Sequence, residues 1–188
     1  MARAHETVKD AANMEHSLTL AIALIWAISV FLWTGDLRSA EEHVDRLVSL
    51  SDSHSLVPYL AVGHGFRAEA AIRRGDAQGG VESLRNNLKK LHAMPYELLS
   101  TSLKITLVEG LAKLGRFAEA MRLTDETIRS VSANGDACYA PELRRVKGGL
   151  LLSMPKPSGN DAETCFGQSL ELSRRQGLAL GNCALRSI

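Results

Sequence analysis

The sequence has few aromatic residues and few prolines, and the lack of both narrows the fold class. Phe, Trp and Tyr together make 5% of the 188 residues, and only five prolines occur. Ala and Leu, two of the strongest helix formers, are abundant instead, and β-branched residues never gather into long strand-like blocks. The composition therefore predicts an all-α protein.

The sequence also lacks the surplus of positive charge that nucleic-acid binding usually needs. Lys and Arg number 22 against 21 Asp and Glu, which leaves a formal net charge of +1. Binding through counterion release from phosphates requires a dense basic surface. The run Arg144-Arg145-Val146-Lys147 holds three cations, but helical spacing distributes them over different faces. We expect no direct nucleic-acid binding by this chain.

Cysteine and histidine are too few and too scattered for a disulfide framework or a metal site. Three cysteines, at positions 138, 165 and 183, are an odd number without metal-ligand spacing. They are typical of reduced thiols in a cytoplasmic protein. The six histidines form no HExxH arrangement or other ligand spacing. We expect a cytoplasmic protein that holds no metal and no cofactor.

Motifs of catalysis are missing as well. No Gly-x-Ser-x-Gly elbow occurs, and the glycine-rich stretch at 75–80 lacks the Gly-Lys-Ser/Thr ending of a P-loop. Carboxylate pairs such as Glu41-Glu42 fall on amphipathic stretches, where a solvated face is the simpler explanation. The sequence therefore predicts no catalytic residues and a protein that is not an enzyme.

One long apolar run is present, from Leu18 to Trp33, with Thr19 and Ser29 as its only polar members. Its sixteen residues fall just short of the roughly 17 that a membrane-spanning helix needs. The preceding residues 1–14 mix acidic and basic side chains, unlike the basic lead of a signal peptide. We predict a helix buried between other helices, preceded by a leader that is flexible or extends it. The alternative is a membrane anchor at Leu18–Trp33.

The chain repeats itself about every forty residues. Gly35, Gly75 and Gly115 each follow an apolar helical run and precede a charged residue and a second, amphipathic run. Glycine adopts the left-handed conformation that ends a helix at little cost. A small residue stands five positions later, where two antiparallel helices would approach closely: Ala40, Gly80, Ala120 and, 42 residues further on, Ala162.

These marks predict four antiparallel helix pairs in one domain, residues 15–188, with units at about 15–53, 54–93, 94–134 and 137–177. The predicted first helices are Glu15–Thr34, Val57–Arg74, Glu97–Leu114 and Ala140–Met154. Their predicted partners are Leu37–Leu50, Ala77–Leu91, Phe117–Val131 and Asp161–Gln176. Residues 178–188 look like the start of a further helix. Unpaired, that helix would expose an apolar edge through which the chain could self-associate.

The small residue, the turn glycine five positions earlier and the apolar first helix resemble tetratricopeptide repeats, although the period is longer than usual. The fourth unit carries a more specific likeness, in Pro141–Leu152, Asp161–Phe166, Ser173–Gly177 and Leu185-Arg186-Ser187. That succession resembles the carboxy-terminal helical domain of large bacterial ATPase and winged-helix transcriptional regulators. Trp33-Thr34-Gly35-Asp36 is similar to the same group.

The resemblance implies an α-solenoid that serves as a non-catalytic scaffold for protein–protein interaction or ligand sensing. It further implies that the chain is part of such a bacterial regulator or derived from one. Neither a P-loop nor a winged-helix sequence occurs here, so the ATPase and DNA-binding functions of those regulators do not carry over.

In tetratricopeptide arrays the first helices line a concave groove, and this likeness gives candidate binding residues. Registering the units on their small residues places these side chains in the groove: Ile25, Ser29, Trp33, Gly65, Glu69, Ile72, Ile105, Glu109, Glu142 and Arg145. The expected occupant is a protein or peptide, or a small effector. The alternative is that Ile25 and both tryptophans are packed core and the charges are solvated.

Overall fold

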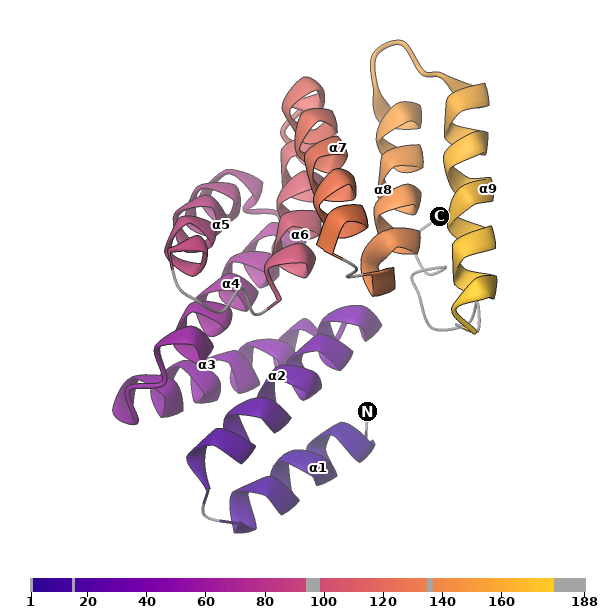
Figure 1. The fold of residues 1–188 in the computed structure, drawn as a ribbon. Coiled ribbons are helices and arrows are strands. Elements are labelled where there is room, and N and C mark those ends of the chain that lie inside the picture. The colour runs from indigo at the N-terminus through magenta and orange to yellow at the C-terminus, as the bar shows by residue number, and fades with distance from the viewer. Residues whose placement is uncertain (1, 15, 94–98, 135–136, 178–188) are drawn as a thin grey trace. The chain divides into compact units, whose positions relative to one another are not determined.

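The computed structural model describes residues 2–14, 16–93, 99–134 and 137–177, and in these ranges the chain is helical without any strand (Figure 1). The chain divides into two compact units, residues 1–103 and 104–188. The helices of the described ranges are α1 (Ala2–Asn13), α2 (Ser17–Thr34), α3 (Leu37–Ser53), α4 (Val57–Arg74), α5 (Ala77–His92), α6 (Ser100–Lys113), α7 (Phe117–Asn134), α8 (Ala140–Ser153) and α9 (Gly159–Arg175), with a short 3-10 turn, η1 (Ala137–Tyr139).

The all-α class is confirmed, and all eight predicted helices are present as α2 to α9. Their ends differ from the predicted ones by at most three residues, as at the start of α6 and the end of α7. Within residues 1–103, α1 packs on α2, α2 on α3, α3 on α4 and α4 on α5, and α2 also contacts α4. Within residues 104–188, α7 packs on α8 and α8 on α9. The expected further helix at 178–188 lies outside the described residues.

The three glycine turns have one geometry. The φ angles of Gly35, Gly75 and Gly115 are 78°, 107° and 71°, all in the left-handed region. In each turn the glycine N–H donates to the carbonyl three residues earlier, and the next N–H donates to the carbonyl five residues earlier. This pair of bonds is the Schellman motif, which satisfies carbonyls that a helix end leaves open. The periodic glycines thus end α2, α4 and α6 in the same way.

A start signal for the next helix follows directly in two of the three turns. The side chains of Asp36 and Asp76 each accept the N–H three residues ahead, at 3.1 and 2.9 Å. This is the N-cap arrangement that aspartate favours. The third turn has Arg116 at this position, and its guanidinium pairs with Glu119 at 2.6 Å instead. The stop signal therefore recurs in every turn, whereas the start signal does not.

The forty-residue period also sets which side chains of α3, α5 and α7 are buried. The small residue is buried in all three helices, and a Cβ at Gly80 would lie 2.5 Å from Cγ1 of Ile72. No larger residue fits there unless α4 and α5 move apart. Three further positions are buried in every one of these helices: Val44, Leu84 and Thr124; Leu47, Asn87 and Thr127; and Ser51, Leu91 and Val131.

Residues 1–14, expected to be a leader, include a separate helix, α1, that packs on α2. Val8 and Ala11 on α1 are buried. The His5 ring lies 4.8 Å from the ring of Phe31 on α2 and 5.2 Å from that of His43 on α3, centroid to centroid. Phe31 and His43 are themselves 5.0 Å apart. A three-ring cluster therefore joins the first three helices.

Replacing a turn glycine isolates the cost of the left-handed backbone. No atom lies within 4 Å of a Cβ built at Gly115, so Gly115→Ala changes the backbone preference without a clash. We expect the free energy of unfolding to fall by about 1 kcal/mol, measured by urea denaturation followed by circular dichroism. Gly149→Ala is the control, because Gly149 lies inside α8 with equally open space. At position 149 alanine should raise the free energy of unfolding by roughly 0.5–1 kcal/mol. A loss of stability in Gly149→Ala would contradict the view that only the left-handed backbone at Gly115 requires glycine.

Because His43 lies in the three-ring cluster, we expect the free energy of unfolding to fall in mild acid. Burial lowers the pKa of His43 below 6.5, and the nearby charges of His5 and Arg46 act in the same direction, against the Ser39 carbonyl and Glu42. The unfolded chain therefore binds a proton more readily than the folded one. Stability contributed by neutral His43 is complete above about pH 6.5 and is lost as the pH falls through the folded pKa.

Hydrogen exchange of the α1 amides at pH 7.5 and pH 5 measures this effect. After correction for the intrinsic exchange rate, which is itself much lower at pH 5, we expect smaller α1 protection factors at pH 5 than at pH 7.5 in the wild-type chain. The His43→Phe variant keeps a ring and cannot take up a proton, so its α1 protection should change less with pH. Equal pH dependence in the two proteins would rule out His43 as the source.

Candidate functional site

An exposed apolar stripe runs along α2, a helix without a single charged residue. One side of α2 is buried against its neighbours, but the other exposes Leu18, Ile22, Trp26 and Trp33. Ile22 is 42%, Trp26 58% and Trp33 64% exposed. Spacings of four, four and seven residues place these side chains on one face of the helix. We call these four residues the α2 stripe.

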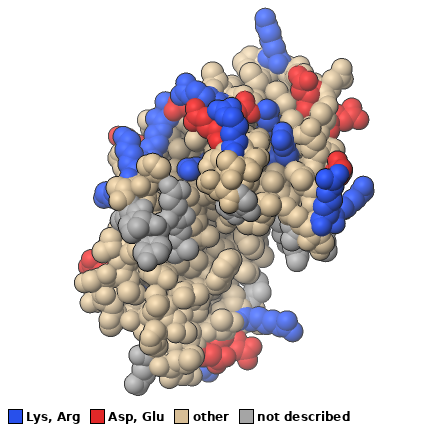
Figure 2. All heavy atoms as spheres, viewed as in Figure 1, with Lys and Arg blue, Asp and Glu red and all other residues tan. Residues whose placement is uncertain are grey.

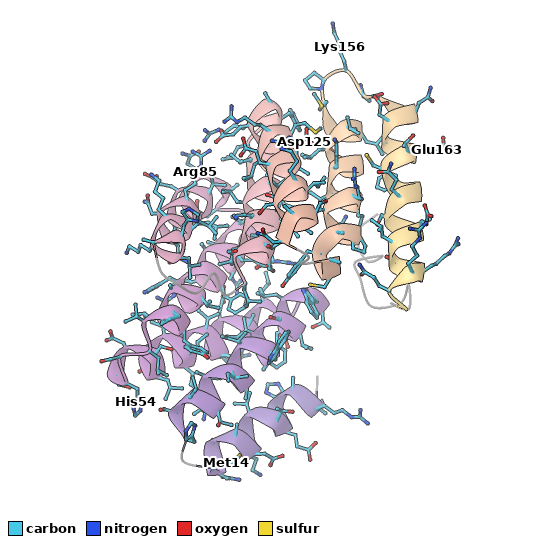
Figure 3. All side chains as sticks on the ribbon, viewed as in Figure 1. Met14, His54, Arg85, Asp125, Lys156 and Glu163 are labelled. Carbon is cyan, nitrogen blue, oxygen red and sulfur yellow. The ribbon has the colours of Figure 1, made fainter. Side chains whose placement is uncertain are left out.

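The surroundings of the α2 stripe are also poor in charge. Met14, labelled in Figure 3, stands at the turn between α1 and α2 and is exposed. In Figure 2, the surface over α1 to α3 is mostly uncharged on the face in view. Soluble monomers rarely leave large contiguous apolar patches open to water, and such patches mark interaction sites. The stripe is therefore the feature of residues 1–103 most suited to binding.

The predicted groove residues of α2 divide between this stripe and the core. Trp33 belongs to the stripe, whereas Ile25 is buried. Ser29 is buried as well, and its hydroxyl donates to the Ile25 carbonyl at 2.9 Å. Ile25 therefore does belong to the packed core, as the alternative explanation had it, but both tryptophans are open to solvent. Ile25 and Ser29 present almost no surface to a partner.

The predicted groove residues of α4 are all buried. A Cβ at Gly65 would lie 2.6 Å from Cδ1 of Leu103, so the missing side chain allows a close approach. Ile72 is core. Glu69 is a buried carboxylate whose Oε1 accepts two hydrogen bonds from the Arg73 guanidinium, at 3.0 and 2.7 Å. These residues hold α4 in place.

Arg73 also joins α4 to α2. One of its terminal nitrogens donates to the Leu32 carbonyl at 3.1 Å. Leu32 lies in the last turn of α2, where the helix dipole favours a cation. Glu69, Arg73 and Leu32 thus form a polar link between α4 and the carboxyl end of α2.

In residues 104–188, three predicted residues come together and one is core. Arg145 donates to both carboxylate oxygens of Glu142, at 2.9 and 2.6 Å, and to Glu109 at 3.3 Å. These hydrogen bonds, chiefly those to Glu142, raise the pKa of Arg145 against the effect of burial. Ile105 is buried. Two carboxylates share one guanidinium, so each charge in this cluster already has a partner within the chain, and the cluster is better suited to joining helices than to binding an ion.

Another ion pair in this unit joins α7 and α8. Lys147 donates to Asp125, labelled in Figure 3, at 2.7 Å. Arg145 and Lys147 are two of the three cations in the basic run at 144–147, and both pair with carboxylates of the chain itself. This leaves little of that run for contacting phosphates.

Sequence reasoning did not place Trp26 or Arg73 among the binding residues. Trp26 stands one position beyond a predicted groove residue, and the shift of one position separates core from solvent in α2. Nearly every position of α2 is apolar, so no periodicity in the sequence marks Trp26 as exposed. Arg73 could have been found from its position four residues after Glu69, the spacing of a helical ion pair.

The described ranges contain no group of three or more His, Cys, Asp and Glu residues that could hold a metal ion. Cys165 is buried and Cys138 is exposed, while Cys183 lies outside those ranges. Helix α2 is long and apolar enough to cross a membrane by length and composition alone, a test that core helices of soluble proteins also pass. No protein-family model matches the chain, and no curated protein matches its sequence.

The Glu69–Arg73 link gives a stability prediction. In the Arg73→Met variant the buried Glu69 carboxylate loses its partner and Leu32 loses a donor. We expect the free energy of unfolding to fall by about 2 kcal/mol in urea denaturation. The matched control is Arg38→Met, which breaks an exposed pair with Glu42 of the same spacing and should have little effect. Similar losses in the two variants would show that the link contributes no more than a surface pair.

Proposed function

We propose that this chain is a non-catalytic interaction scaffold of tetratricopeptide-like helix pairs, and that it binds a protein through the α2 stripe. The observation that carries the proposal is the exposure of both tryptophans on a helix whose opposite side is buried core. Tryptophan is enriched among the residues that dominate protein–protein binding energy. Two of them in line with Ile22 and Leu18 provide the anchors that an apolar helix face would need.

The tetratricopeptide-like arrangement is supported by the helices of residues 1–103. Each first helix there is followed by its partner across a Schellman turn, and the first helices α2 and α4 also contact each other. Contact between successive first helices is what lets helix pairs stack into a solenoid. The recurrence of buried positions at intervals of forty residues supports the same arrangement.

The resemblance of the fourth unit extends the proposal to biological role. The chain is then part of a bacterial transcriptional regulator, or derived from one, and works in the cytoplasm as its interaction or sensing domain. A membrane-tethered scaffold anchored by Leu18–Trp33 is the second candidate, favoured by the length and apolar character of α2. Fractionation separates the two, because a tethered chain needs detergent to leave the membrane.

The binding function can be tested without knowing the partner. A phage-displayed library of amphipathic helical peptides is selected on the purified chain, and enriched peptides are measured by fluorescence anisotropy. The double variant Trp26→Ser and Trp33→Ser should weaken binding at least tenfold, since each tryptophan contributes more than about 1 kcal/mol. The control is Val57→Ser, at an exposed apolar residue of α4 outside the stripe. Peptides that bind the wild-type chain and the double tryptophan variant equally well would refute the assignment of the binding site to the α2 stripe.

A further inference from the structure

The same two positions have opposite exposure in the two first helices of residues 1–103. Ile22 and Trp26 on α2 are 42% and 58% exposed, whereas Val62 and Phe66, forty residues later on α4, are 0% and 2% exposed. The two helices have the same length, the same glycine turn and the same aspartate after it. The difference therefore comes from the neighbours of each helix.

Helix α4 packs against the first helix that precedes it, α2, and the described residues hold no first helix that precedes α2 in the same way. α2 contacts α4, and Arg73, which shares a face with Val62 and Phe66, reaches the Leu32 carbonyl of α2. Among the described residues of this unit, α2 contacts α1, α3 and α4. No earlier first helix packs on α2 in the way that α2 packs on α4. The α2 stripe is thus the face at which one more helix would pack, left open.

The open face is close to symmetric along the helix, which suits a second copy of itself. Trp26 lies midway along α2, and in an antiparallel pair centred on it each Ile22 faces the partner's Val30, which is half-buried here. Position 18 would then lie opposite position 34, which places Leu18 at one end of the stripe beside Trp33 at the other end. Because α2 carries no charge, such a pairing brings no like charges together. Antiparallel helix dipoles also oppose each other favourably.

The area of the stripe fits a homodimer. From its exposed fractions, the stripe with Met14 offers on the order of 500 Å² of apolar surface. A stable interface takes about 800 Å² from each partner, of which roughly 65% is apolar in homodimers. A membrane surface fits less well, because helices that lie in the lipid interface carry Lys and Arg along their polar side, and α2 has neither.

We propose that the α2 stripe is the interface of a twofold homodimer in which two copies of α2 pack antiparallel about Trp26. The inference rests on the proposed function and names its partner, a second copy of this chain. A dyad at Trp26 places the two indole rings against each other, and the contact is isologous, so assembly stops at the dimer.

Sedimentation equilibrium of the full chain tests the proposal. We expect a dimer at about 50 µM that dissociates on dilution. Trp26→Glu brings two carboxylates together at the axis and should weaken the dimer at least a hundredfold. Trp26→Phe should keep most of the affinity. Leu170→Glu, at an exposed apolar residue of α9, is the matched control and should leave the dimer unchanged.

Tryptophan fluorescence gives a second measurement that needs no variant. The chain has two tryptophans, and both lie on the stripe. On raising the concentration through the dimerisation range, the emission maximum should shift to the blue as both rings leave water. An emission that stays constant while the mass doubles would place the dimer contact elsewhere and overturn the proposal.

The remaining outcomes separate this inference from the binding function. A chain that stays monomeric at about 100 µM, yet binds selected peptides through Trp26 and Trp33, overturns the dimer and leaves the function intact. A monomer that binds no peptide overturns both. Monomeric chain that sediments with phosphatidylcholine vesicles, and loses this with Trp26→Glu, would assign the stripe to a lipid surface instead.

Discussion

The left-handed glycine that ends each first helix is the constraint on which the rest of the architecture depends. With φ near +70° to +110°, it reverses the chain within two residues and satisfies the open carbonyls of the helix that it ends. The reversal fixes where the second helix starts, and so brings the small residue five positions later against the first helix. At Gly80 this contact is so close that a Cβ would lie 2.5 Å from Ile72.

Because the glycine turn fixes where the second helix starts, each buried position of that helix lies the same number of residues after the glycine in every repeat. This explains why positions in α3, α5 and α7 that are forty residues apart are buried alike although their side chains differ. Leu47 is apolar, but its counterpart Asn87 is polar and is satisfied by the Ala61 carbonyl at 2.6 Å. Thr127, the third counterpart, bonds to a carbonyl of its own helix. Burial is set by the turn even where the polar group is left unsatisfied, since the buried Ser51 hydroxyl has no hydrogen-bond partner among the described residues.

The helices could be predicted from the sequence because their signals are local. Glycine turns and apolar periodicity each act within a few residues, so the helix ends could be placed to within three residues. Predicting α1 as part of a leader missed its packing, because Val8 and Ala11 are too few to make a visible stripe. The ring contact of His5 joins residues far apart in the sequence, and no local pattern indicates it.

The binding face was harder to predict for the same reason. On a helix that is apolar all round, the sequence does not distinguish the side that faces other helices from the side that faces water. Ile25 and Trp26 are neighbours in the sequence, but one is core and the other is more than half exposed. Which of the two is buried depends on where the neighbouring helices pack, and local sequence does not encode that tertiary arrangement.

The exposed stripe and the buried Glu69 are two solutions to one problem. Each first helix must cover the side that faces the preceding one, and on α4 the Glu69–Arg73 pair does so by bonding to the carboxyl end of α2. At the equivalent positions α2 has Ser29 and Trp33, which carry no charge, and among the described residues no first helix packs on α2 as α2 packs on α4. A polar link forms where the neighbour is fixed within the chain, whereas an open apolar face suits a neighbour that binds and dissociates. The free energy of covering that face is then available for association.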